Sequence, residues 1–197
     1  MTASQTDAAG NSGIGSATVL KDTVRPTVAM GAPSATLVNA AGSVTCGITY
    51  TGADTVDLLP TGVTLGRTGT ADCAVNVLNG TTATPTVSLS GCTGNGTVTI
   101  SIDTATSYDA AGNYNFAVGP GTAITVDNTV PSIASAVTQD SDNDGRIDRY
   151  MITFDNNVND STFVVGNWIV AGYTVVSMTS GAVNDNVIYL NVTEMTF

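Results

Sequence analysis

Histidine is absent from this 197-residue chain, and lysine and arginine together number only five. Without histidine, the serine–histidine and cysteine–histidine catalytic arrangements are excluded. The three cysteines form no C-x-x-C pair, which argues against a zinc site. Five cations are too few to follow a phosphate backbone or an anionic lipid surface, so neither nucleic acid nor a membrane surface is an expected partner. No apolar run approaches the roughly 18 residues of a transmembrane helix, and no membrane insertion is expected.

Helix-forming residues are also scarce, because lysine, glutamate and glutamine are nearly absent while threonine, valine, serine, glycine, alanine and asparagine dominate. This balance favours short strands joined by turns. The net charge of −11 comes mainly from aspartate and suits divalent cations. The first residues contain neither the basic start nor the apolar stretch of a signal peptide. We therefore expect the chain to be a segment of a longer exported protein.

A five-residue motif, Asp-Ala-Ala-Gly-Asn, occurs at 7–11 and again at 109–113, 102 residues apart. Each copy precedes a junction that begins with Asp and ends with Pro, at 22–26 and at 127–131. A period of about a hundred residues is that of a β-sandwich domain. The predicted parts are a tail strand of a preceding repeat (1–21), a complete sandwich repeat (22–131) and a truncated second sandwich (132–197).

Alternation of apolar and polar residues predicts the strands. In the complete repeat the predicted strands lie at or near 26–31, 44–50, 54–59, 71–77, 84–90, 98–102 and 122–127. In the second domain the predicted strands are 150–154, 163–165, 168–170, 174–178 and 187–192. The predicted fold class is therefore all-β, with antiparallel sandwich domains of which the last is incomplete.

The stretch 140–148 reads D-x-D-x-D-G-x-x-D. Carboxylates at alternate positions repel one another at short range unless a cation sits between them. The spacing matches positions 1, 3, 5, 6, 7 and 9 of an EF-hand-type calcium loop, but position 12 is Met151 instead of glutamate, so water or another strand must complete the coordination. The alternative is a solvated acidic turn. The predicted ligands of a structural calcium site are Asp140, Asp142, Asp144, the Arg146 carbonyl and Asp148.

The repeated Asp-Ala-Ala-Gly-Asn motif has two interpretations. Aspartate can cap its own turn, and glycine and asparagine supply left-handed backbone positions. The alternative is a second calcium site formed by Asp109, Asn113 and Asp127 near a domain junction.

A disulfide can be predicted from strand register. If 70–78 and 84–90 form a hairpin with their apolar residues inward, Cys73 lies opposite Gly91. A bulge at Gly91 then brings Cys92 to the same face. We predict a Cys73–Cys92 bridge, favoured by an oxidising compartment, with Cys46 as a small buried apolar residue. The alternative is three reduced core cysteines.

Several segments resemble the immunoglobulin-like repeats of large bacterial surface proteins and adhesins. They are Thr49-Tyr-Thr-Gly-Ala-Asp-Thr-Val56, Thr93-Gly-Asn-Gly-Thr-Val-Thr-Ile-Ser101, the motif at 109–113 and Val126-Asp-Asn-Thr-Val-Pro131. The stretch 140–155 resembles a repeat of similar exported proteins that opens on a calcium loop, and the loop itself is similar to a thrombospondin type 3 half-repeat. The resemblance implies tandem immunoglobulin-like sandwiches in an extracellular, chain-extending protein whose domain junctions calcium stiffens.

The expected function is therefore a non-enzymatic extracellular module, a calcium-stiffened spacer or adhesive repeat at a bacterial cell surface. Its expected partners are neighbouring repeats or subunits, with a cell-surface or glycan ligand as a further possibility. One alternative is a filament subunit whose Ser16–Lys21 strand completes a neighbour's sheet. Another is a carbohydrate-binding module of an exported enzyme. An exposed row of aromatic residues would support that module, and the strand alternation predicts none.

Overall fold

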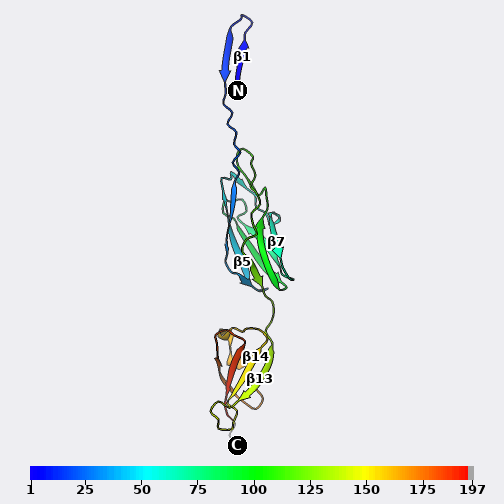
Figure 1. Cartoon of the computed structure of the whole chain (residues 1–197), viewed down its shortest axis with the longest axis vertical. Helices are drawn as coiled ribbons and strands as arrows, with labels where there is room; N and C mark the ends of the chain where they lie inside the picture. The colour runs from blue at the N-terminus through cyan, green and yellow to red at the C-terminus, as the bar shows by residue number, and fades with distance from the viewer. Residues whose placement is uncertain (195–197) are drawn as a thin grey trace. The chain divides into compact units, whose positions relative to one another are not determined.

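The computed structural model describes residues 1–194 and divides the chain into two compact units, Met1–Asn128 (unit 1) and Thr129–Phe197 (unit 2). The boundary falls inside the predicted junction at 127–131. Strands dominate both units (Figure 1), which confirms the all-β prediction. Helical structure within residues 1–194 is limited to three short 3-10 turns, η1 (Pro60–Gly62), η2 (Asp160–Thr162) and η3 (Val165–Asn167). None of the described helices has the length or apolar character needed to cross a bilayer.

The first residues form a β-hairpin in place of the single tail strand that the sequence predicts. Strands β1 (Thr2–Thr6) and β2 (Ser12–Ser16) pair antiparallel around the first Asp-Ala-Ala-Gly-Asn motif. The Asp7 carboxylate accepts hydrogen bonds from the amides of Ala9 and Asn11, so the motif reverses the chain and its two flanks pair with each other. Beyond Ser16, the predicted Ser16–Lys21 strand does not form, and all residues from 1 to 25 are exposed.

Unit 1 contains two four-stranded sheets that enclose one core. One sheet has the order β3 (Thr27–Pro33), β5 (Ser43–Thr51), β9 (Thr86–Thr93), β8 (Asp72–Leu78). The other has the order β4 (Leu37–Val38), β12 (Ile124–Val126), β10 (Gly96–Ile102), β7 (Val63–Arg67). Only the β4–β12 pair is parallel among these pairings. A short ribbon of β6 (Thr55–Val56) and β11 (Ser107–Tyr108) lies beside them.

Period-two alternation explains this core. Strand β5 buries every second residue, and β10 does the same from the facing sheet. All seven strands predicted for residues 22–131 have a counterpart, although 54–59 shrinks to the two residues of β6. Strand β7 was not predicted, because Val63 and Leu65 give only a short alternation between glycines at 62 and 66. The inward residues of β5 and β10 are Val44, Cys46, Ile48 and Tyr50, and Val98, Ile100 and Ile102.

The disulfide joins Cys73 and Cys92, whose Cα atoms are 4.1 Å apart. Val75 pairs with Leu89 and Ala74 with Ser90, and the register then shifts by one residue before Asp72. Gly91 stands at this bulge with a φ of 56°, in the left-handed region that glycine adopts at no steric cost. Cys46 is buried as a free thiol whose Sγ lies 3.1 Å from the Gly31 carbonyl oxygen, and burial raises the pKa of this thiol.

Unit 2 forms a single sheet with the order β13 (Ile133–Gln139), β14 (Arg149–Phe154), β16 (Val187–Val192), β15 (Val175–Ser180) (Figure 1). The described part of this unit contains no second sheet, so the sandwich predicted for 132–197 is absent there. The predicted strands at 163–165 and 168–170 do not form: only Val165 lies in a 3-10 turn, and only Val170 makes an isolated bridge, with Tyr173. The reason is local: Asn159 accepts from the Ser161 amide and starts η2, and Gly166 and Asn167 are poor strand formers. Strand β13, which the alternation did not reveal, is exposed along nearly all of its length.

One buried asparagine ties the β11 ribbon to the rest of unit 1. Asn115 is fully buried, and its Oδ1 accepts from the Ser107 amide at 2.8 Å and from the Ser107 hydroxyl at 3.2 Å. Its Nδ2 donates to the carbonyls of Asp103 at 3.2 Å and Phe116 at 3.0 Å. The two hydrogen bonds with Ser107 are buried, so water cannot replace Asn115 there, and the two bonds to carbonyls are partly buried. Asn115 therefore satisfies backbone groups that the strands leave unpaired.

We expect Asn115→Ala to destabilise unit 1 by about 3 kcal/mol, because it leaves several buried donors and acceptors unpaired. Urea unfolding followed by circular dichroism measures this loss. The matched control is Asn76→Ala, which removes an exposed asparagine of β8 and should change the free energy of unfolding by less than about 0.5 kcal/mol. Equal losses in the two variants would contradict the assigned role of Asn115.

Candidate functional site

The acidic loop 140–148 connects β13 to β14 in unit 2. Its base is closed by the pairing of Gln139 with Arg149, reinforced by a hydrogen bond of 2.8 Å from Arg149 Nε to Gln139 Oε1. The Asp148 amide also donates to the Gln139 carbonyl. Two residues in left-handed conformations shape the loop, Asn143 with φ 60° and Gly145 with φ 91°. Asparagine and glycine are the residues that adopt such conformations most readily.

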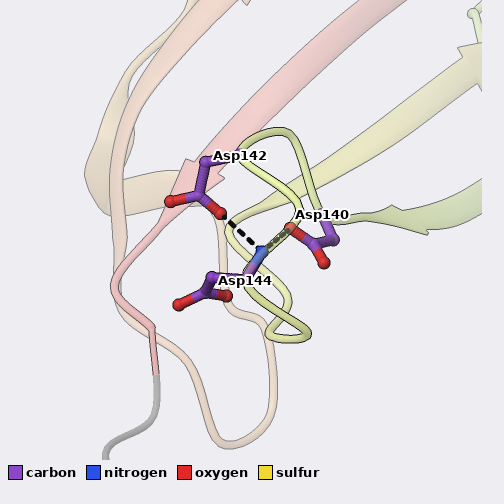
Figure 2. Close-up of side chains that lie close together, drawn as sticks. All are labelled: Asp140, Asp142 and Asp144. Carbon is purple, nitrogen blue, oxygen red and sulfur yellow. Dashed lines mark hydrogen bonds between the residues drawn. The ribbon is translucent and has the colours of Figure 1, made fainter.

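Asp140, Asp142 and Asp144 are brought together as the sequence predicts, with one carboxylate oxygen of each within 4.8 Å of the others. Figure 2 shows the Asp140 and Asp142 carboxylates both accepting from the Asp144 amide, at 3.2 and 3.3 Å. The second oxygen of Asp140 accepts from the Gly145 amide at 2.8 Å. Backbone hydrogen bonds therefore orient the carboxylates of this loop and hold their negative charges close together.

Asp148 belongs to a second group, formed with Asp142 and Glu194, whose carboxylate oxygens also lie within 4.8 Å of one another. Asp142 is common to both groups. Asp148 is therefore close to Asp142, but it is not in the same group as Asp140 and Asp144. The Asp148 carboxylate accepts from the hydroxyl and the amide of Ser141, and the hydroxyl hydrogen bond is the main reason why the pKa of Asp148 is lowered. This carboxylate is held ionised and faces the cluster.

Glu194 is the ligand candidate that the sequence analysis missed. It follows β16, and the Val192 amide donates to the Asp148 carbonyl at 2.9 Å, which brings the end of β16 beside the loop. Two clues were available, since Glu194 is the single glutamate of the chain and the loop lacks its position-12 ligand. Period-two alternation could not say which strand end would lie next to the loop.

Arg146 contributes a positive charge to the same place. Its Nε lies 3.9 Å from Asp144 Oδ2, and its Nη1 lies 3.8 Å from Glu194 Oε2. Burial, followed by the charges of Asp144 and Asp142, raises the pKa of Glu194, and Arg146 offsets only part of this effect. Five carboxylates in two overlapping groups thus repel one another. Because they offer only oxygen ligands, they are suited to a hard divalent cation such as calcium.

The second predicted calcium site does not assemble. Asp109 and Asn113 form a closed turn in which both carboxylate oxygens accept hydrogen bonds from Asn113, the same arrangement as Asp7 and Asn11 in the hairpin. Asp127 lies near the opposite end of β10, because Val126 pairs with Gly96 whereas Asn115 contacts the residue after Ile102. The structure therefore favours the turn-capping interpretation of the motif.

Three aromatic residues of unit 1 are exposed around the turn at 109–113, although they do not form the row on one sheet that would mark a carbohydrate-binding module. Tyr108, Tyr114 and Phe116 are 40%, 47% and 70% exposed. The two tyrosine rings meet edge to face at 5.6 Å. Arg25 lies over the Phe116 ring at 4.6 Å and donates to the Tyr114 carbonyl. Alternation along a strand did not reveal this group because its members flank a turn.

Comparison of the chain with protein-family models, with curated proteins and with solved structures finds no match. The resemblance of several segments to bacterial surface repeats therefore remains an expectation from the sequence. The acidic loop and its neighbours in unit 2 offer the clearest functional chemistry.

Glu194→Gln tests whether Glu194 belongs to this cluster. Because its pKa is raised, ionised Glu194 opposes folding of the calcium-free protein, and this penalty is present at neutral pH and vanishes as the pH falls below about 4.3, the ordinary value for glutamate. The variant should therefore melt slightly higher than wild type at pH 7 without calcium, and equally at pH 3.5. Its calcium affinity should fall about tenfold by calorimetry. A variant with unchanged calcium affinity would exclude Glu194 as a ligand.

Proposed function

We propose that this protein is a non-enzymatic, calcium-binding structural module of an extracellular surface protein. The observation that carries the proposal is that two clusters of acidic side chains share Asp142. One cluster lies within the 140–148 loop, and the other includes Glu194 beyond β16. A cation in this cluster would link the β13–β14 connection to the end of β16. Its role would be to stiffen unit 2.

The chemistry of the cluster favours calcium over other metals. All the side chains that converge there are carboxylates, and calcium takes six to eight oxygen ligands in flexible geometry. The Arg146 carbonyl and water are available to complete the sphere, as in other calcium loops. A zinc site would require cysteine or histidine ligands, and the chain has no histidine.

The fold of unit 1 supports an extracellular spacer. The seven main strands of unit 1 are β3, β5, β7, β8, β9, β10 and β12. If these are numbered one to seven in chain order, the sheet β3-β5-β9-β8 has the order first, second, fifth, fourth. The other contains the third, sixth and seventh. This is the strand order of constant-type immunoglobulin sandwiches, which often occur in cell-surface proteins. The Cys73–Cys92 disulfide agrees with an oxidising compartment, and neighbouring repeats are the partners that such a module would have.

A second candidate function is glycan binding by the exposed aromatic group of unit 1. The hairpin copy of the same turn carries Thr6, Ser12 and Ile14 at the positions that correspond to Tyr108, Tyr114 and Phe116. The turn therefore does not need aromatic flanks. Exposed rings beside a polar turn are suited to stacking on the apolar face of a sugar.

The calcium proposal predicts selective stabilisation of unit 2. With an affinity on the order of 10⁻⁴–10⁻³ M, calcium in tens-fold excess over Kd should raise the melting temperature of this unit by roughly 10 °C. Fluorescence of Trp168, the single tryptophan of the chain, reports unit 2. Asp142→Asn, which alters the shared residue, should abolish the rise, and Asp185→Asn should retain it. Identical melting curves for wild type in calcium and in EDTA would refute the proposal.

The glycan candidate is tested by affinity electrophoresis in gels containing dextran or mannan. We expect wild-type migration to be retarded and the double variant Tyr114→Ala, Phe116→Ala to migrate freely, since it removes two of the three exposed rings. Tyr189→Ala, which removes a ring of unit 2, serves as the control. Retardation that persists in the double variant would rule out this surface.

A further inference from the structure

Strand β13 is the least covered strand of unit 2. It lies at the edge of the sheet, with β14 on one side and no strand on the other within residues 1–194. Six of its seven residues are exposed, and even Ala136, which pairs with the buried Ile152, is uncovered. The strand contains no charged residue and no proline, the residues that usually protect an edge. Its free edge is therefore suited to pairing with a strand of another molecule.

The segment 18–21, Thr-Val-Leu-Lys, is a strand candidate without a sheet. It follows the β1–β2 hairpin, is exposed throughout and belongs to none of the described strands. The side chains of Val19 and Leu20 are 78% and 91% exposed. Covering these two apolar side chains would be favourable, because it removes apolar surface from water.

The internal repeat indicates where this segment fits. In unit 1 the motif at 109–113 is followed by β12, which ends directly before the junction at 127–131, and the segment 18–21 ends directly before the junction at 22–26. The segment therefore holds the place of β12. Strand β12 pairs parallel with β4, the last strand before the turn that leads into β5. The end of β13 lies in the same way before the loop that leads into β14, so its free edge corresponds to the edge of β4 that β12 covers.

We propose that the segment 18–21 of one copy of this chain adds as a parallel strand to the free edge of β13 in a second copy. The pairing of β12 with β4 gives the register, since Val126 lies beside Val38, the last residue of β4. By correspondence Lys21 lies beside Gln139, the last residue of β13, and Val19 lies beside Val137. Val137 is 47% exposed, so the two valines shield each other from water. The register shift of β13 lies between 133 and 135, outside this stretch.

Charge favours the parallel direction. A parallel strand carries Lys21, the single lysine of the chain, to the end of β13 where the acidic loop begins at Asp140. An antiparallel strand would carry Lys21 to the opposite end. Because the net charge of −11 opposes association of two copies, this local attraction selects one orientation. Each copy has one segment and one free edge, so the contact is heterologous and continues from copy to copy.

Light scattering of the whole chain at increasing concentration, in calcium and in EDTA, tests this contact. We expect the weight-average mass of wild type at least to double in one of the two solutions. Leu20→Asp and Val137→Asp should each stay monomeric, because each removes one half of the contact. The matched control, Val183→Asp, adds the same charge at an exposed valine elsewhere in unit 2 and should associate as wild type does. If Val137→Asp fails to fold by circular dichroism, Val137→Lys replaces it.

A mixture of the two variants distinguishes this contact from pairing of β13 with itself. Leu20→Asp retains the free edge and Val137→Asp retains the segment, so an equimolar mixture should form dimers and nothing larger. Self-association of Leu20→Asp alone would indicate pairing between two β13 strands and overturn the proposal. A monomeric wild type in both solutions, a mixture without dimers, or loss of association in Val183→Asp would overturn it as well.

Discussion

Hydrogen bonds from backbone amides to aspartate and asparagine side chains hold together the turns on which this structure depends. The chain has few long charged residues and many short polar ones. The side chains of these short residues accept hydrogen bonds from backbone amides of the same loop and so stabilise the connections between strands. Asp7 and Asp109 close identical five-residue turns, and Asp140 and Asp142 gather the amides of the acidic loop. The same device therefore builds inert turns and a candidate metal site. The two differ in whether hydrogen bonds from the same loop occupy both oxygens of each carboxylate.

This distinction explains why only one of the two predicted calcium sites brings several carboxylates together. In the 109–113 turn, Asn113 donates hydrogen bonds to both oxygens of the Asp109 carboxylate, and the Asp54 carboxylate that approaches the turn accepts from the Ala110 amide. In the acidic loop, several carboxylates accept only one or two amides each and still face one another. Repulsion that a loop does not relieve internally would be relieved by a positive charge beside it. Arg146, at 3.8 and 3.9 Å from its two partners and partly exposed, supplies little of it.

Strand positions in unit 1 could be predicted from the sequence because alternation there is strict, as in β5, where every second residue is buried. The bulge at Gly91 could be predicted because two half-strands had incompatible registers around the cysteines. Unit 2 was harder. Its apolar residues at 163–170 cover a single sheet as irregular turns, and such residues satisfy no simple period. The place of Glu194 depends on contacts between distant segments, which local patterns do not encode.

The order of strands in unit 2 has a mechanical consequence. β13 and β16 both pair antiparallel with β14, so they run in the same direction, and the chain enters the sheet at Ile133 and leaves it after Val192 at the other end. Tension applied through the chain would thus pull along the strands and shear the ladders of β14 on both sides at once. Many hydrogen bonds would have to break together, unlike the one-by-one rupture of a hairpin pulled from its open end. A cation clamped between the loop and Glu194 would sit where that load leaves the sheet.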